Sequence, residues 1–86
     1  MDEHPIDIAV IINGQPIALD QVAVKAVLRT IVERALSKSG NSGQPVDNWE
    51  LRDANGQILD LQKTVEHYGI IGGAKLFLNL KAGVGG

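Results

Sequence analysis

Residues 6–19 read Ile-Asp-Ile-Ala-Val-Ile-Ile-Asn-Gly-Gln-Pro-Ile-Ala-Leu, and they give the clearest indication of the fold. Isoleucine or valine occupies every second position over residues 6–12, which is the period of a half-buried strand. The following Asn13-Gly14 pair is typical of a two-residue hairpin turn, because both central residues of that turn need a positive φ. Residues 16–19 form the return strand, and Pro16 loses no needed ladder bond at its start. The chain therefore opens with a β-hairpin.

A helix is expected next, over residues 21–38. Asp20 is placed to cap it, because its carboxylate can accept hydrogen bonds from the free N–H groups of the first turn. Lys38 suits the negative end of the helix, and Gly40 can adopt the left-handed conformation that ends it. The apolar positions recur at helical spacing and predict the buried face, which consists of Val24, Val27, Leu28, Ile31, Ala35 and Leu36.

The second half of the chain predicts several short elements. They are a strand over residues 47–53 with Trp49 and Leu51 pointing inward, a turn over 54–56, a short strand over 57–59, a short helical turn over 61–67 capped by Asp60, and a last strand over 74–81. The order β-β-α-β-β-short helix-β predicts an α+β fold, a mixed sheet with one helix packed across it. The right-handed crossover rule allows the first and last strands to sit side by side at its centre.

Length and composition limit the function classes. With 86 residues the chain suits one domain, which we expect over residues 6–81 between a flexible N-terminus (1–5) and a flexible tail (82–86). A net charge of −2 gives no field for nucleic-acid phosphates. The absence of cysteine excludes a disulfide framework, a zinc-cysteine site and a thiol nucleophile. No apolar run reaches the roughly 20 residues of a membrane span, the acidic start is no secretory signal, and the lack of cysteine fits a reducing compartment, so a cytoplasmic location is expected. We also expect the chain to be a monomer.

The end of the chain resembles ubiquitin. Ubiquitin carries a Thr-Leu-x-x-Tyr-x-Ile stretch before its last strand, and Thr64-Val65-Glu66-His67-Tyr68-Gly69-Ile70 is similar to it, with valine for leucine. An alternating leucine strand at Leu76, Leu78 and Leu80 then leads to Gly85-Gly86, as in ubiquitin. The resemblance covers roughly residues 6–86, and the helix and the Trp49 strand look closer to bacterial ubiquitin-like proteins. It implies the β-grasp fold and three enzyme partners: an adenylating activating enzyme, a conjugating enzyme and a JAB-type deconjugating peptidase.

Two departures from ubiquitin bear on the partners. The isoleucine of ubiquitin's main recognition patch corresponds to Arg52 here, and its valine to Asn79. A binder tuned to that patch would have to bury a charge and an amide, each costly when unpaired. The tail approach, Lys81-Ala82-Gly83-Val84, also lacks most of the basic residues found before ubiquitin's diglycine. A dedicated set of enzymes is therefore implied.

The resemblance implies a protein modifier whose Gly86 carboxylate is activated as an acyl-adenylate, passed through enzyme thioesters and joined to target proteins. Gly85 and Gly86 suit this chemistry because glycine lacks Cβ and can thread a narrow channel. A sulfur carrier that forms a C-terminal thiocarboxylate would share the fold and the diglycine. A non-covalent interaction module, in which the tail is inert, is the third alternative. In each case the chain is not an enzyme and holds no cofactor, since ATP is used by the activating enzyme.

The remaining candidate sites are weaker. His4 and His67 are the only histidines, and no Ser-His-acid spacing predicts a catalytic triad, so no catalytic residue is assigned. Asp2, Glu3, His4 and Asp7 read as a solvated acidic end rather than a metal site. On the outer face of the sheet, Ala9, Ile11 and Phe77 should form an apolar spot flanked by Arg52 and Asn79. Such a spot either contacts a partner or is ordinary scattered surface.

Overall fold

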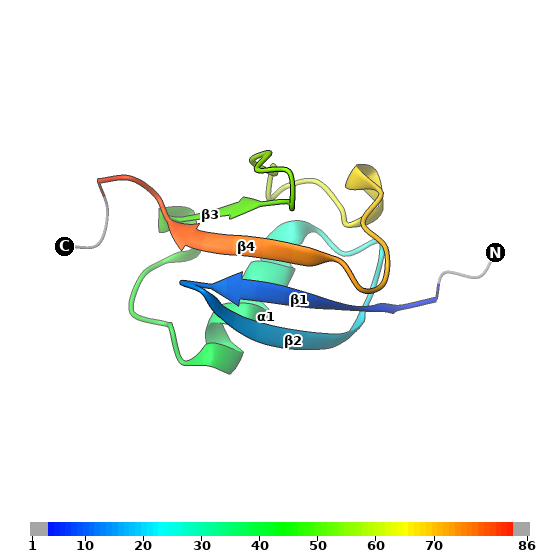
Figure 1. Ribbon diagram of the computed structural model, residues 1–86, viewed down its shortest axis with the longest axis horizontal. Helices are drawn as coiled ribbons and strands as arrows, with labels where there is room; N and C mark the ends of the chain where they lie inside the picture. The colour runs from blue at the N-terminus through cyan, green and yellow to red at the C-terminus, as the bar shows by residue number, and fades with distance from the viewer. Residues whose placement is uncertain (1–3, 84–86) are drawn as a thin grey trace.

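The computed structural model describes residues 4–83 of the chain (Figure 1). Its elements, in chain order, are β1 (Ile6–Ile12), β2 (Gln15–Val22), α1 (Leu28–Ser39), the 3-10 turn η1 (Val46–Asn48), β3 (Trp49–Arg52), the 3-10 turn η2 (Glu66–Tyr68) and β4 (Lys75–Leu80). No helix among these residues is long and apolar enough to cross a membrane.

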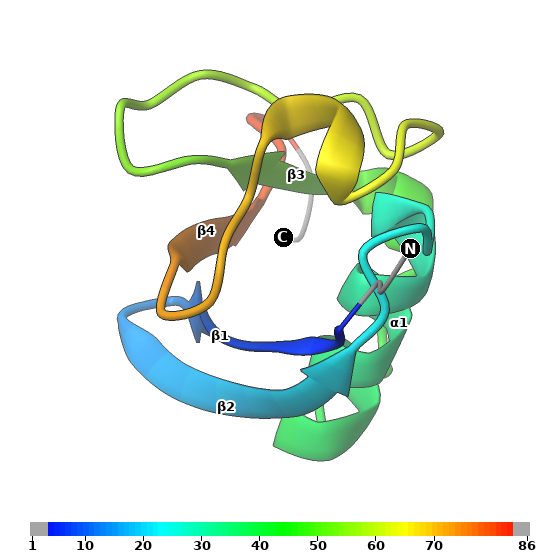
Figure 2. The same ribbon diagram turned by 90° about the vertical axis from the view of Figure 1, so that its right-hand side faces the viewer.

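The strands form one mixed sheet in the order β2-β1-β4-β3. β1 and β4 run parallel at its centre, whereas β2 and β3 pair antiparallel with them at the two edges. Helix α1 lies across one face, behind the strands in Figure 1 and to their right in Figure 2. The opposite face, toward the viewer in Figure 1, is called the outer face below. The predicted α+β β-grasp architecture, with the first and last strands adjacent, is confirmed.

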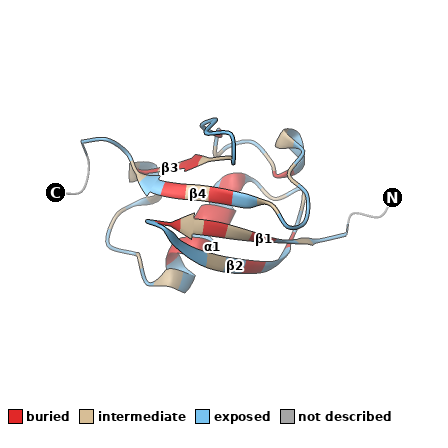
Figure 3. Cartoon of the chain, viewed as in Figure 1, coloured by how far each residue is buried: buried red, intermediate tan, exposed pale blue. Residues whose placement is uncertain are grey.

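The core lies between the sheet and α1 and is almost entirely aliphatic. Period-two alternation places buried residues on the inner side of β1, β3 and β4, visible as red segments alternating with tan along β1 and β4 in Figure 3. Trp49 and Leu51 point inward as predicted, with 4% and 1% of their surfaces exposed. The other buried residues are Ile8, Val10, Ile12, Leu19, Val22, Leu28, Ile31, Val32, Ala35, Leu36, Leu59, Val65, Leu76 and Leu78.

The hairpin turn follows the prediction, but its second strand is longer. Asn13 and Gly14 both have positive φ, 50° and 86°, as a two-residue turn with this twist requires. β2 then continues to Val22, which pairs with Ile6, instead of ending at residue 19.

The predicted start of the helix is therefore wrong. Asp20 lies in β2, and α1 begins seven residues later than expected, after an N-cap at Val27 that makes no side-chain capping bond. The first-turn donors are satisfied from elsewhere in the chain: the N–H of Leu28 bonds to the carbonyl of Lys63 (2.8 Å), and that of Arg29 to the carbonyl of Leu61 (2.9 Å). These tertiary contacts take the place of a capping side chain, so no capping residue stands before Leu28 to mark the start of the helix in the sequence. The predicted stop is correct, since Gly40 is left-handed with φ 76°.

The other corrections concern the short elements. The strand expected over 57–59 is reduced to an isolated bridge between Arg52 and Ile58, so the sheet has four strands. The helical turn expected over 61–67 is the 3-10 turn η2, although the Asp60 carboxylate does accept a bond from the Gln62 N–H, at 2.9 Å. The strands predicted over 47–53 and 74–81 are each shorter at both ends, because residues 46–48 form η1 and the ladder with β4 spans only four residue pairs.

A left-handed residue in β2 gives a testable stability effect. The register of the hairpin shifts between Ile6 and Ile8, and Gln21 at this bulge has φ 56°, a region in which a Cβ is strained. Replacing Gln21 with glycine should raise the free energy of unfolding by about 0.5–1 kcal/mol, as measured by urea denaturation. Ala18→Gly, in the same strand without positive φ, should lower it by about 0.5–1 kcal/mol. Equal effects of the two changes would contradict this interpretation.

Candidate functional site

The chain leaves the sheet at the end of β4, and this exit is the root of the predicted tail. The N–H of Lys81 donates to the carbonyl of Asn48 at 2.9 Å, which still ties the chain to the region just before β3. Lys81, Ala82 and Gly83 are all exposed, and Gly83 adopts a left-handed φ of 85°. In Figure 1 this segment projects beyond the arrowhead of β4, at the end of the sheet where the β1–β2 turn also lies. Val84, Gly85 and Gly86 lie outside the described residues, so their role stays a prediction.

Charges around the tail root are largely paired. The Asp47 carboxylate accepts a hydrogen bond from Nη1 of Arg29 at 2.8 Å, and this contact, helped by the charge of Lys81, lowers the pKa of Asp47. The same bond raises the pKa of Arg29, which also lies 3.6 Å from the Glu33 carboxylate. Asp47 therefore stays ionised and bonded to Arg29 at neutral pH. The positive charge at the tail root itself belongs to Lys81.

A cavity of about 240 Å³ lies beside the tail root and is lined by residues of β3 and of the segment 58–61. It combines apolar and charged side chains, contributed by Asp47, Trp49, Glu50, Leu51, Ile58, Leu59, Leu61 and Lys81. Of the residues that line the cavity, Ile58 is 55% exposed to solvent, whereas the neighbouring Leu59 is buried in the core. A partner that binds the tail would therefore also contact this cavity.

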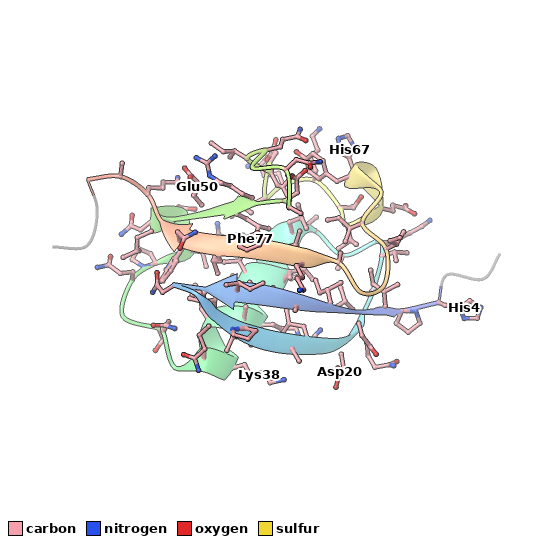
Figure 4. The ribbon with its side chains drawn as sticks, in the orientation of Figure 1. His4, Asp20, Lys38, Glu50, His67 and Phe77 are labelled. Atoms are coloured by element: carbon pink, nitrogen blue, oxygen red, sulfur yellow. The ribbon has the colours of Figure 1, made fainter. Side chains whose placement is uncertain are left out.

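The predicted apolar spot on the outer face is assembled by strand register. Phe77 of β4 lies opposite Ile11 of the parallel β1 and opposite Arg52 of the antiparallel β3, and Ala9 follows along β1. Ala9, Ile11 and Phe77 are half-buried, and Figure 4 shows Phe77 in the middle of this face. Asn79 is exposed and lies opposite Glu50. The structure thus brings together all five residues predicted for the partner-binding surface.

Arg52 is held in place by bonds within β3 and the turn that follows. Its Nε and Nη2 lie 2.8 and 2.7 Å from one oxygen of the Glu50 carboxylate, and its Nη1 donates to the carbonyl of Gly56 at 2.8 Å. Its charge is therefore paired beside Phe77, and a partner need not supply a carboxylate for it. Glu50 was not among the five residues predicted for the partner-binding surface, because its role follows from a side-chain contact between residues two apart along β3.

The apolar spot extends further over the hairpin than predicted. Pro16 lies opposite Ile11 and Ala18 opposite Ala9, and both are exposed on β2. The two-residue turn at Asn13-Gly14 contains the signal that could have found them, since it fixes which residues of the two strands face each other. Together, Ala9, Ile11, Pro16, Ala18 and Phe77 span three strands.

The Tyr68 region stabilises the structure. The hydroxyl of Tyr68 accepts a bond from the backbone N–H of Asp60 at 2.9 Å, while the ring packs against the core. The neighbouring His67 is exposed, and its ring makes an edge contact with Tyr68 at a centroid distance of 4.9 Å. Within residues 4–83 no three His, Cys, Asp or Glu side chains gather in a way that could hold a metal ion.

Comparisons with known proteins agree with this architecture. A family model described as a protein of unknown function (DUF2604) matches residues 1–86. A relative from Sinorhizobium fredii (strain NBRC 101917 / NGR234), the uncharacterized protein y4jI, is 38% identical over 81 residues, covering 94% of this chain. The chain spans 62% of the length of that relative.

Among solved structures, the ubiquitin of Caldiarchaeum subterraneum has a TM-score of 0.75 and 25% identity, covering 95% of this chain and 99% of its own. A de novo designed protein based on ubiquitin has a TM-score of 0.80 and 21% identity, covering 99% of both chains. The N-terminal ubiquitin-like domain of the 4931431F19Rik protein has a TM-score of 0.75 and 19% identity, covering 99% of this chain and 83% of its own. The last two likenesses concern the fold alone.

Proposed function

The chain belongs to the DUF2604 family and is a ubiquitin-like β-grasp protein, and from this premise we propose that it is a protein modifier joined to its targets through Gly86. In this proposal the chain is a substrate of other enzymes and performs no catalysis itself. Its partners are an adenylating activating enzyme, a conjugating enzyme, a JAB-type deconjugating peptidase and the modified proteins.

The observation that supports the proposal most directly is the exit of the chain from β4. A central strand, fixed on both sides by β1 and β3, leads into exposed residues with small or no side chains beyond Lys81. The sequence then continues as Val84-Gly85-Gly86. A rigid body with a slender extension suits an activating enzyme, because the body gives a surface to hold and the extension can enter a narrow channel.

The proposed chemistry has four steps. One carboxylate oxygen of Gly86 attacks the α-phosphorus of ATP and displaces pyrophosphate, which gives an acyl-adenylate on the activating enzyme. A cysteine of the activating enzyme then attacks the Gly86 carbonyl carbon, loses its thiol proton to solvent and displaces AMP. A cysteine thiol of the conjugating enzyme attacks this thioester and displaces the first cysteine, which takes up a proton as it leaves. Finally a target amine or hydroxyl attacks the second thioester and displaces the cysteine thiol.

We propose that these enzymes bind the outer face of the sheet. The apolar side chains of Ala9, Ile11 and Phe77 supply area that leaves water on binding, and apolar area of this kind often marks partner contacts. Arg52 and Asn79 stand where ubiquitin has apolar residues, so we propose that enzymes dedicated to this family read this face.

Mass spectrometry of conjugates tests the proposal. The chain, tagged at its N-terminus, is produced in its native host and purified under denaturing conditions with anything bound covalently. Trypsin cuts after Lys81, so a conjugated target should yield peptides in which a lysine carries Ala-Gly-Val-Gly-Gly, residues 82–86, as a branch. A chain ending at Gly83 is the control and should give no branched peptide.

The same experiment separates the alternatives. A free chain whose mass shows one sulfur-for-oxygen exchange at Gly86, without branched peptides, would identify a sulfur carrier. Neither product, together with full cellular activity of the chain ending at Gly83, would leave a non-covalent interaction module and overturn the proposal.

A further inference from the structure

The root of the tail carries a cation that the structure leaves unpaired. Lys81 is exposed and forms no ion pair with any of the described residues. The two carboxylates that line the cavity with it are each bound by an arginine instead. Nη1 of Arg29 donates to Asp47 at 2.8 Å, and two nitrogens of Arg52 lie 2.8 and 2.7 Å from one oxygen of Glu50. The positive charge of Lys81 is therefore available to a partner.

Asp47 is the carboxylate placed to take this charge away from a partner. β3 begins where β4 ends (Figure 1), and the backbone N–H of Lys81 donates at 2.9 Å to the carbonyl of Asn48, the residue after Asp47. The charge of Lys81 also contributes to the lowered pKa of Asp47, after the larger effect of Arg29. An exposed carboxylate beside an ammonium pairs with it when no other cation holds it. The bond from Arg29 therefore decides which cation Asp47 binds.

Arg29 is a fixed point, whereas the Asp47 side chain is free to turn. The backbone N–H of Arg29, in the first turn of α1, donates to the carbonyl of Leu61 at 2.9 Å, and its Nε lies 3.6 Å from the carboxylate of Glu33 one turn later. The Asp47 side chain is 80% exposed, and the bond from Arg29 is the one hydrogen bond that its carboxylate forms with the described residues. Without Arg29, little packing would keep Asp47 in its present direction.

We propose that Arg29 is a positioning residue for the conjugation reaction: it holds Asp47 away from Lys81, so that the ammonium of Lys81 stays free to bind a carboxylate of the activating enzyme. This inference rests on the proposed function of the chain as a modifier. Arg29 acts through Asp47 and does not touch the reacting Gly86. When Arg29 is lost, Asp47 pairs with Lys81, and the carboxylate of the enzyme meets a neutralised tail root.

This role differs from that of an ordinary stabilising ion pair. An exposed pair contributes little to stability, and the removal of either partner loses the same contribution. The proposed role is asymmetric, because Arg29→Ala releases a competing carboxylate, whereas Asp47→Ala removes that competitor. Asp47→Ala should therefore restore what Arg29→Ala loses, which a double-mutant cycle detects as a coupling of opposite sign.

Conjugation in a lysate of the native host, supplied with ATP and the tagged full chain, tests the proposal. Conjugates are counted through the N-terminal tag on denaturing gels, because Lys81→Ala also removes the trypsin site. Arg29→Ala should raise the chain concentration for half-maximal conjugation about threefold to fivefold and leave the maximal rate unchanged. Arg29→Ala combined with Asp47→Ala should restore the original value, and Arg29→Ala should have no further effect in a chain that carries Lys81→Ala. Arg34→Ala removes the same charge from α1 and should change the value less than about twofold.

Nuclear magnetic resonance of the free chain tests the exchange of partners without any enzyme. In Arg29→Ala the pKa of the Asp47 carboxyl should stay below its ordinary value, because Lys81 replaces Arg29, and adding Lys81→Ala should return the pKa to that value. Equal Asp47 pKa values in these two variants, or a combined Arg29→Ala and Asp47→Ala chain that conjugates as poorly as Arg29→Ala, would overturn this inference and leave the proposed function intact. An unchanged chain that forms no conjugates would overturn both.

Discussion

Replacing Leu78 with alanine is expected to lower the free energy of unfolding by about 3–4 kcal/mol, out of a total of about 5–10 kcal/mol for a domain of this size. Leu78 is completely buried in β4, opposite Ile12 of β1 and opposite Leu51 of β3, so its side chain contacts the core from the middle of the sheet. Shortening it removes apolar contacts from three strands and leaves a cavity that the rigid central pairing cannot close.

Trp49 provides the measurement. It is the single tryptophan and is buried in the neighbouring strand, so its fluorescence should report the urea-induced unfolding of the whole core. The control is Asn79→Ala, at the adjacent, exposed position of β4, which should change stability by no more than about 0.5 kcal/mol. Losses of similar size for the two variants would show that Leu78 is not at the centre of the core.

The fold was predictable where short-range patterns and tertiary contacts demand the same structure. The period-two alternation of β1 and β4, the Asn13-Gly14 turn and the Gly40 helix stop all act within a few residues. The start of α1 was not predictable in this way, because its first N–H groups bond to carbonyls more than 30 residues away. Asp20 offered a local cap, and the longer pairing of β2 with β1 took precedence over it.

The outer face illustrates the same division. Alternation alone placed Phe77, Ile11 and Ala9 on one face, because side chains in a strand alternate between faces. Which residues of different strands lie opposite each other depends on register, and the pairing of Arg52 with both Glu50 and the carbonyl of Gly56 depends on side-chain rotamers. The bonds from Arg34 and Lys38 of α1 to the carbonyls of Asp20 and Ala18 depend in the same way on how the helix packs against β2. Sites that depend on such contacts between strands and side chains can be identified only from the structure.

Replacing Gly85 with valine is expected to reduce the formation of conjugates about a hundredfold or more while leaving the free energy of unfolding unchanged. The reason lies in the proposed reaction: the chain must bring the Gly86 carboxylate to ATP through a channel built for a bare backbone. A branched side chain one residue before the reacting carbon restricts φ and ψ and displaces the carboxylate, and a misplacement of about 1 Å can cost about a hundredfold in rate.

The matched control is Ala82→Val, which adds a similar branched side chain three residues earlier in the tail approach, where the chain is exposed just beyond the sheet. It should retain conjugation within about threefold, because the added side chain lies three residues before the position that must enter the proposed channel. Conjugates are counted by branched peptides, and Trp49 fluorescence confirms that both variants fold alike. If Gly85→Val conjugates as well as Ala82→Val, a glycine at position 85 is not needed for passage through a narrow channel. The carboxylate would then be activated by an enzyme that holds the folded body alone.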